Sequence, residues 1–251
     1  HYVAGFEYLP KNTTRFTIEG FYKTYSHYPI SVLDGISIAN KGTEFGAIGN
    51  EEITQTGKGR AFGLELFAQQ KLTDKLFGVF SYTIYKSEFT GLNNKYVAAS
   101  WDNGQLISMT AGYKLPKNWE IGLKFRYQGA APYTPYNETA SRANYLALGS
   151  GILDYSKINS MRLSAFNSGD IRIDKKWNNK KTTYDFYIDI TNFYGSVAKE
   201  ADLYTFKRND ANTAFVTTDG LPVKADGSNA IPVYLKNSQS TILPSIGLIV
   251  E

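Results

Sequence analysis

The sequence predicts an all-β protein, an antiparallel transmembrane β-barrel that contributes about nine strands from this chain. Three observations predict this fold. Apolar and polar side chains alternate with a period of two over long segments, aromatic residues make up 15% of the chain, and short connections alternate strictly with long ones. A period of two places successive side chains on opposite faces of a strand, whereas a helix would mix them around its circumference.

The clearest alternation lies in residues 119–128 (WEIGLKFRYQ). The odd positions begin with Trp119 and end with Tyr127, and the positions between them are aliphatic or phenylalanine. The even positions are polar or glycine. Amphipathic rings favour the headgroup level of a bilayer and hydrocarbon side chains favour its interior, so this order is the one that a membrane strand requires.

The same alternation recurs along the chain and predicts nine strands. Segments such as 15–31 and 76–89 exceed the about 5–6 residues usual for strands of globular proteins. They suit the roughly 9–11 residues that cross a bilayer at a tilt, with extra length to project beyond it. A soluble β-sandwich also alternates and is the alternative. The nine candidates are 1–9, 15–25, 61–69, 76–88, 107–115, 119–128, 170–177, 184–191 and 241–251.

The connections set the expected topology. The short ones carry Pro, Asn, Asp and Lys, which favour tight turns. The long ones exceed what compact soluble domains usually contain. Short turns on one rim and long loops on the other are typical of an outer-membrane barrel, with the turns in the periplasm and the loops outside the cell. The short connections are 10–14, 72–75, 116–118 and 178–181, and the long ones are about 33–58, 90–102, 130–168 and 197–240.

This order of connections also indicates that the barrel is incomplete. The first strand leads into a short turn and therefore begins at the outer rim, whereas the last strand ends at the periplasmic rim. A complete bacterial single-chain barrel has an even number of strands with both ends in the periplasm. We therefore expect residues 1–251 to be a single unit, the C-terminal portion of a larger barrel.

Composition argues against most catalytic and metal-binding classes. The chain has no cysteine and only two histidines, His1 and His27, and its net charge of +4 is too mild to indicate nucleic acid as a partner. No G-x-S-x-G, H-E-x-x-H or P-loop motif occurs, so we expect no enzymatic activity, no catalytic residue, no cofactor and no metal site. The run 219–229 superficially resembles a calcium loop. It lacks the terminal bidentate glutamate, and we interpret it as turn chemistry.

Several short motifs follow one another in an order that resembles the C-terminal β-barrel of TonB-dependent outer-membrane receptors. The stretch 59–67 (GRAFGLELF) resembles the mid-barrel strand of that family, with an inward glutamate at Glu65. Two departures occur: the chain stops at Glu251 where the family usually closes on an aromatic residue, and Phe193 follows Asn192 where a second asparagine is usual. The other motifs are 81–83 (SYT), 112–116 (GYKLP), 125–129 (FRYQG), 132–135 (PYTP), 171–177 (IRIDKKW), 188–192 (IDITN) and 247–251 (GLIVE).

The resemblance implies a barrel of 22 strands with a lumen plugged by an N-terminal globular domain, neither plug nor earlier strands being in this chain. It implies an active transport receptor of the Gram-negative cell outer membrane that imports a scarce large solute with TonB-transmitted energy. The solute stays open among siderophore, cobalamin-like chelate, oligosaccharide and peptide. The implied partners are the TonB complex, the plug, outer-membrane lipid, the outer-membrane assembly machinery and the imported ligand. The alternatives are a passive porin-like channel and a soluble β-sandwich ligand-binding domain.

Three sets of site residues follow from the barrel interpretation. Residues expected to face the lumen would dock the plug or wet the substrate path, or would only pair across strands and stabilise the barrel. Outer-loop residues would contact ligand, or would pack the loop against its neighbours. The lumen set is Glu19, Lys23, Glu65, Gln69, Lys124, Arg126, Asp170, Arg172, Asp174, Asp185 and Asp189; the loop set is Tyr133, Tyr136, Arg142 and Tyr145; the lipid-facing aromatic girdle is Tyr113, Trp119, Tyr127, Trp177 and Tyr184.

Overall fold

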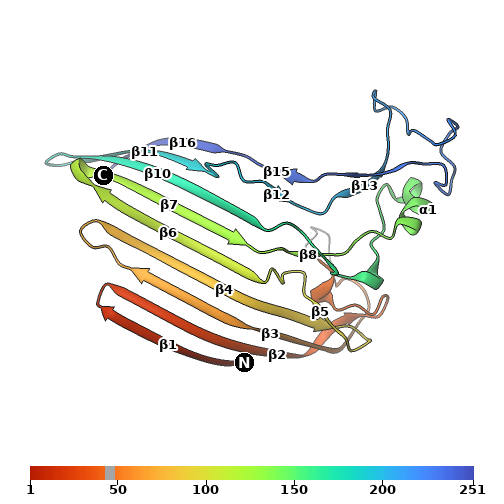
Figure 1. Ribbon diagram of the computed structural model, residues 1–251, viewed down its shortest axis with the longest axis horizontal. Coiled ribbons are helices and arrows are strands. Elements are labelled where there is room, and N and C mark those ends of the chain that lie inside the picture. Colours follow the sequence, from red (N-terminus) through yellow and green to blue (C-terminus); the bar gives the residue numbers. More distant parts are fainter. Residues whose placement is uncertain (43–48) are drawn as a thin grey trace.

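A computed structural model describes residues 1–42 and 49–251, and its main feature is one antiparallel sheet. Nine long strands lie side by side in chain order, and the short strand β5 (Tyr96–Ala98) pairs with β4 as a tenth. Figure 1 shows the nine strands running between a rim of tight turns and a rim of long loops. They are β1 (Tyr2–Lys11), β2 (Thr14–Ser31), β3 (Ile53–Gln70), β4 (Leu76–Thr90), β6 (Gln105–Leu115), β7 (Trp119–Gln128), β10 (Phe166–Asn178), β11 (Thr183–Thr191) and β16 (Leu243–Val250).

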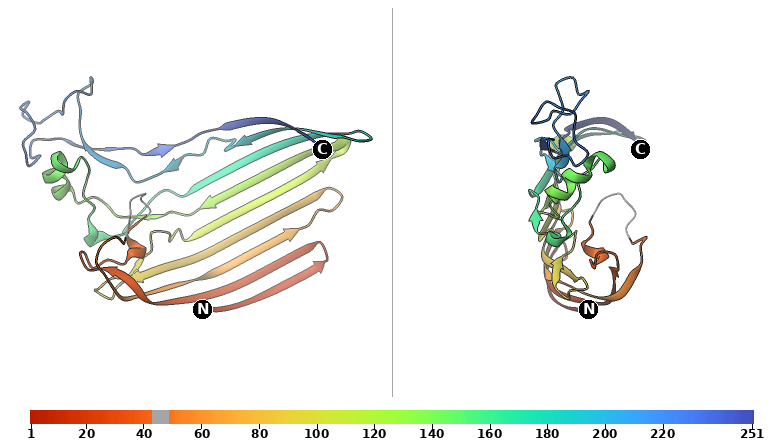
Figure 2. Two further views of the ribbon diagram at one scale, coloured as in Figure 1. Left: turned by 180° about the vertical axis from the view of Figure 1, so that it is seen from behind. Right: turned by 90° about the vertical axis from the view of Figure 1, so that its right-hand side faces the viewer.

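The predicted all-β class, the nine strands and their antiparallel order are confirmed. The main difference is at strand starts: β3 begins at Ile53 and not at 61, and β10 begins at Phe166 and not at 170. The sheet is curved, as its edge-on view in Figure 2 shows, and it is a single layer and not two sheets packed face to face. This curvature is what a segment of a barrel wall requires.

Local chemistry explains the tight turns. At the turn between β6 and β7, the 3₁₀ turn Pro116–Asn118 holds Lys117 and Asn118 at φ of 61° and 60°. Asparagine tolerates this left-handed region better than most residues do, and proline at the turn start fixes its own φ. The turn between β10 and β11 closes with a hydrogen bond from the Asn179 N–H to the Thr182 carbonyl at 2.9 Å.

The loop rim carries structure of its own that the sequence analysis did not predict. The helix α1 (Glu138–Leu148) lies within the predicted loop 130–168; the Asn137 side chain caps its start by accepting from the Ala140 N–H, and Gly149 ends it at a φ of 69°. Short 3₁₀ turns cover Ile38–Asn40 and Tyr155–Lys157. Three two-stranded sheets pair β8 (Pro132–Tyr133) with β9 (Met161–Arg162), β12 (Ala198–Lys199) with β15 (Ser238–Gln239), and β13 (Leu203–Phe206) with β14 (Pro232–Leu235).

The buried core lies at the loop rim rather than beneath the sheet. One buried cluster joins Ala39, Phe89 and Ala99, and a second joins Tyr204, Phe206 and Ala230. The middle of the sheet instead leaves large apolar side chains exposed, for example Leu64 at 49% and Ile188 at 39%. Within the described residues, no helix is long and apolar enough to cross a membrane.

Candidate functional site

The sheet has one apolar and one polar face, and the strand register defines both. Residues directly across from one another in neighbouring strands share a face. One such row joins Ile18, Leu66, Tyr82, Ile107 and Tyr127 without interruption. We call the face of this row the apolar face and the opposite one the polar face.

All five predicted girdle residues lie on the apolar face. Trp119, Trp177, Tyr184 and Tyr113 gather near the turn rim and Tyr127 lies at the other end of β7. The Lys175 ammonium lies between the rings of Trp119 and Trp177, 5.4 and 5.7 Å from their centroids, and donates a hydrogen bond to the Lys117 carbonyl. A lysine that lies along aromatic rings while its charge reaches a polar rim is the arrangement seen where strands meet a membrane interface.

The predicted lumen residues all share the polar face. A second continuous row joins Arg15, Gln69, Val79, Thr110, Lys124 and Asp170. The remaining members follow at even spacings along the same strands, or lie directly across from a member, as Asp189 does from Arg172. The structure therefore places eleven side chains from five strands on one surface: Glu19, Lys23, Glu65, Gln69, Lys124, Arg126, Asp170, Arg172, Asp174, Asp185 and Asp189.

On β7, β10 and β11 three ion pairs join charges of the polar face. The Arg172 guanidinium binds Asp174 at 2.7 Å and lies 3.8 Å from the ring centroid of Tyr187. Lys176 lies 3.4 Å from Asp185, and Arg126 lies 4.0 Å from Asp170. Opposite charges that meet across strands stabilise a sheet, so this part of the polar face has the contacts of a self-sufficient wall.

On β2 and β3 the polar face differs, because Glu19 and Glu65 stand directly across from each other. Within the part of the chain that the structure describes, neither carboxylate forms a salt bridge. Both side chains are exposed. Gly5 faces Glu19 on the other side, and a Cβ there would lie 3.4 Å from the Glu19 Cβ, so the glycine leaves this carboxylate accessible. Like charges directly opposite destabilise a sheet unless a cation joins them.

Four polar residues join three of the long loops, and we call them the loop clamp: Asn40, Asp102, Asn159 and Arg162. Asp102, whose side chain is 3% exposed, accepts from Arg162 Nη2 at 2.6 Å and from the Ser87 N–H at 2.8 Å. The Asn159 amide donates to the carbonyls of Asn40 and Ala98. No local sequence motif marks these residues, because their contacts join positions about sixty or more residues apart.

The predicted loop residues divide into two environments. Tyr145 is packed into the aromatic cluster at the loop rim, with its ring centroid 4.5 Å from that of Phe206 and its hydroxyl 2.6 Å from Thr205 Oγ1. Arg142 lies beside Tyr204 in the same cluster, where burial raises the pKa of the tyrosine hydroxyl although the cation acts in the opposite direction.

Tyr133 and Tyr136 line an open groove of about 390 Å³ at the loop rim, and Tyr136 also packs against the aromatic cluster, with its ring centroid 5.8 Å from that of Tyr204. Its other lining groups include Tyr234, Arg162, Lys199 and Asp202. Aromatic rings beside charges of both signs can bind a ligand that has flat or apolar surfaces together with polar groups.

The run 219–229 is a set of turns. The Asn229 amide donates to Asp219 and to the Pro222 carbonyl, and its oxygen accepts from the Lys224 N–H. The hydrogen bond from the Asn229 amide, and then that from the Leu221 N–H, hold the pKa of the Asp219 carboxyl below its ordinary value. Within residues 1–42 and 49–251, no group of three or more His, Cys, Asp or Glu side chains is arranged to hold a metal ion.

Comparisons with known proteins give matches in structure alone. No family model and no curated protein matches the sequence. The ferric-catecholate import receptor Fiu of E. coli K12 superposes with a TM-score of 0.54 and 12% identity over 98% of this chain. The FpvAI–pyocin S2 complex gives 0.52, and the ferripyoverdine receptor of the Pseudomonas aeruginosa outer membrane, bound to ferripyoverdine, gives 0.51, each at 12% identity and 98% coverage.

This chain spans about a quarter of the length of these solved proteins, 26–27%. The predicted likeness to the barrel of TonB-dependent receptors is confirmed at the level of the fold.

Proposed function

We propose that this chain forms part of the wall and outer loops of a plugged receptor in the outer membrane of a Gram-negative bacterium. The receptor imports a scarce large solute with energy transmitted by TonB. The fold supports this proposal, and two of the similar solved proteins are the ferric-catecholate import receptor Fiu and the ferripyoverdine receptor. A ferric chelate is therefore the first cargo to test, ahead of a cobalamin-like chelate, an oligosaccharide or a peptide. We propose no enzymatic activity for this chain.

The observation that carries the proposal is the carboxylate pair Glu19–Glu65, which stands directly opposed across β2 and β3 without a salt bridge to either member within the described residues. On β7, β10 and β11, by contrast, three ion pairs join charges of the polar face. In the wall of an open passive channel, two opposed carboxylates would favour the passage of cations. A plug domain that presents an arginine or lysine there would convert their repulsion into a charge-assisted contact. We infer that this pair is a docking point for the plug.

In this mechanism the wall is the scaffold and the moving part lies elsewhere. The paired charges on β7, β10 and β11 keep the polar face hydrated and fixed. The groove at Tyr133 and Tyr136 offers rings for the first contact with cargo. TonB acts on the plug, which rests against Glu19 and Glu65, and movement of the plug opens the path.

Uptake by the intact polypeptide that contains this chain tests the proposal. Cells that depend on it should accumulate a radiolabelled ferric chelate, and a protonophore or loss of TonB should abolish accumulation. In planar bilayers the purified protein should be nearly silent. Steady conductance, or uptake that ignores the protonophore, would identify a passive channel instead.

A pair of variants tests the docking point. Glu19→Gln with Glu65→Gln should weaken the seat of the plug and so raise conductance in the presence of about 4 M urea, a concentration within the range that unfolds small domains. Glu7→Gln is the matched control, because Glu7 shares the polar face of β1 and already binds Arg15 at 2.6 Å. Equal conductance in the double variant and in the control would remove the assigned role.

A further inference from the structure

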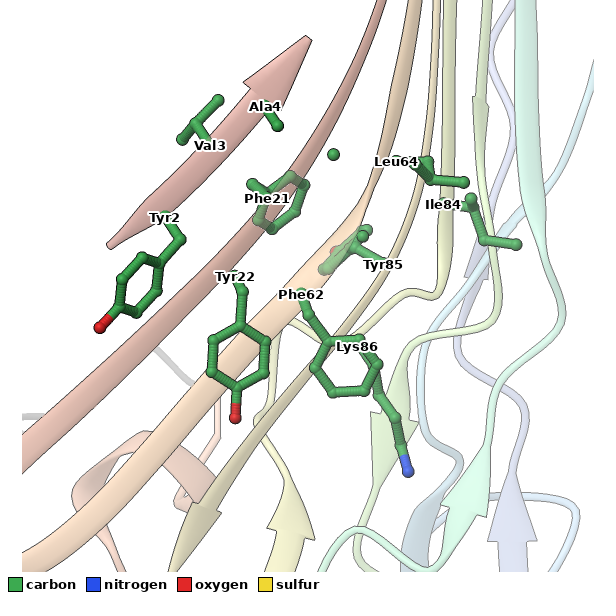
Figure 3. A pocket seen from close by; sticks show the side chains of 12 residues that line it. Tyr2, Val3, Ala4, Phe21, Tyr22, Phe62, Leu64, Ile84, Tyr85 and Lys86 are labelled. Atoms are coloured by element: carbon green, nitrogen blue, oxygen red, sulfur yellow. The ribbon is translucent and has the colours of Figure 1, made fainter.

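A groove of about 660 Å³ opens on the apolar face of β1, β2, β3 and β4. One edge of it is a row of side chains directly across from one another, Tyr2, Tyr22, Phe62 and Lys86. Figure 3 shows these four in succession on neighbouring strands. The rings of Tyr22 and Phe62 are stacked at 6.1 Å between centroids.

The depth of the groove comes from missing side chains. The next row toward the turns is Ala4, Gly20, Leu64 and Ile84, so the two positions on β1 and β2 are the smallest residues. A Cβ at Gly20 would meet the Leu64 Cδ2 at an ordinary 3.5 Å and nothing closer. A larger residue therefore fits there without backbone strain, and glycine at this position is not required by the sheet.

Charged side chains lie at the end of this row, where Lys86 stands, and on its loop-rim side, where Arg60 and Glu88 stand directly across from each other. Lys86 and Arg60 both bind Glu88, at 2.5 and 2.7 Å, and Arg60 lies 4.2 Å from the ring centroid of Tyr96. Two cations share one carboxylate, so the lip of the groove keeps a net positive charge. Arg60 and Lys86 are 36% and 52% exposed, and each retains N–H donors that Glu88 does not use.

We propose that this groove seats one acyl chain of a phosphorylated lipid of the outer leaflet, with a phosphate oxygen on Lys86 and Arg60. The proposal rests on the proposed function, which places the apolar face in lipid. Toward the loop rim, the row of small and aliphatic residues is followed by the row of aromatic rings that ends at Lys86, and then by Arg60. This is the order of hydrocarbon, interface and phosphate in a lipid. A phosphate accepts from both cations, whereas an apolar protein surface that filled the groove would offer no acceptor for the N–H donors that Glu88 leaves unused.

Native mass spectrometry of the intact polypeptide, delipidated in mild detergent and titrated with purified lipid A, tests the assignment. Lipid A treated with phosphatase and phosphatidylethanolamine are the comparison probes. The wild-type protein should bind lipid A about tenfold more tightly than the phosphatase-treated form, since a hydrogen bond to a charged group contributes about that factor in affinity. Lys86→Gln should abolish this preference, and Gly20→Leu, which fills the groove, should weaken binding of both forms.

Two controls lie on the same face away from the groove. Ala111→Leu enlarges a small residue of β6, and Lys175→Gln removes an outward lysine at the turn rim. Both should behave as wild type, and heat-modifiable migration in gels verifies that each variant is folded. Equal binding of the three probes overturns the proposal, and so does a Gly20→Leu variant that binds lipid like the wild type. The proposal is also overturned if the protein forms a dimer that Gly20→Leu abolishes and that lipid does not affect. Chelate uptake should be unchanged in Gly20→Leu, which separates failure of this site from failure of the transport function.

Discussion

Replacing Asp102 with alanine should release the loop clamp without unfolding the sheet. The substitution removes a carboxylate that accepts from Arg162 Nη2 and from the buried Ser87 N–H. Each hydrogen bond to a charged group contributes about 1.5–3 kcal/mol. Because the Arg162 side chain is 42% exposed, breaking its pair with Asp102 costs less free energy than breaking a fully buried pair, for which the cost is about 3–5 kcal/mol. We expect a cost of about 2–4 kcal/mol for opening the junction.

Amide hydrogen exchange measures this cost directly, because local opening has its own free energy. At about 1.4 kcal/mol per factor of ten, exchange in peptides that cover 96–103 and 158–163 should accelerate about 30- to 1,000-fold. Peptides from β7 should not change. The control Lys157→Ala breaks an exposed pair with Asp154, which is worth at most about 1 kcal/mol. Acceleration of less than about threefold, or equal acceleration in the control, would refute the assigned role of Asp102.

Three further outcomes are expected. In a refolded chain without a plug, Glu65→Gln should raise the free energy of unfolding by about 0.2–1 kcal/mol, because the substitution removes repulsion from Glu19. Denaturant titration measures this free energy, and a decrease in the variant would contradict the prediction. Hydrogen bonds from Lys41 and then Ser31 hold the pKa of the Glu51 carboxyl below its ordinary value. The stabilisation that these hydrogen bonds give to the folded loop is therefore present above the ordinary pKa of the carboxyl, and it is lost as pH falls through the lowered pKa. Limited proteolysis near residue 32 should accordingly accelerate in acid, and Glu51→Gln should remove that pH dependence. Tyr145→Phe should cost about 1 kcal/mol of local stability and leave cargo affinity unchanged, whereas Tyr133→Ala should lower cargo affinity measured by fluorescence quenching.

The strands could be predicted from the sequence because alternation is a local property. In 119–128 each side chain reports its face without reference to any other strand, and the register places all of them as expected. The turns could be predicted for the same reason, since Pro116 and Asn118 set their own backbone angles. The early start of β3 could not be predicted from the sequence. Residues 53–60 contain two glycines and do not alternate clearly, and they become a strand only through pairing with β2 and β4.

The loop rim was harder to predict because its order comes from distant contacts. The sequence of helix α1 does contain local capping residues, Asn137 and Glu138 where the helix begins and Gly149 where it ends. The length of the connection 130–168 nevertheless predicts a loop. The loop clamp left none: Asn40 and Asn159 are ordinary loop asparagines until the structure brings them together. Residue types at the loop rim suggested Tyr133 and Tyr145 equally, and only the fold separates the groove, which Tyr133 lines, from the packed cluster, which holds Tyr145.

The distribution of charge on the polar face distinguishes a wall that stabilises itself from a wall that receives a partner. Arg172 and Asp174 form their contact within one strand, and Lys176 meets Asp185 across a single pair of strands, so both would persist in any barrel. Glu19 and Glu65 have the same cross-strand proximity and the opposite sign relation. A sheet under selection for stability alone gains by replacing either glutamate with a neutral residue. A third, cationic group would make the arrangement favourable. In the proposed docking of a plug, a cation of that plug would supply this group on the polar side of β2 and β3.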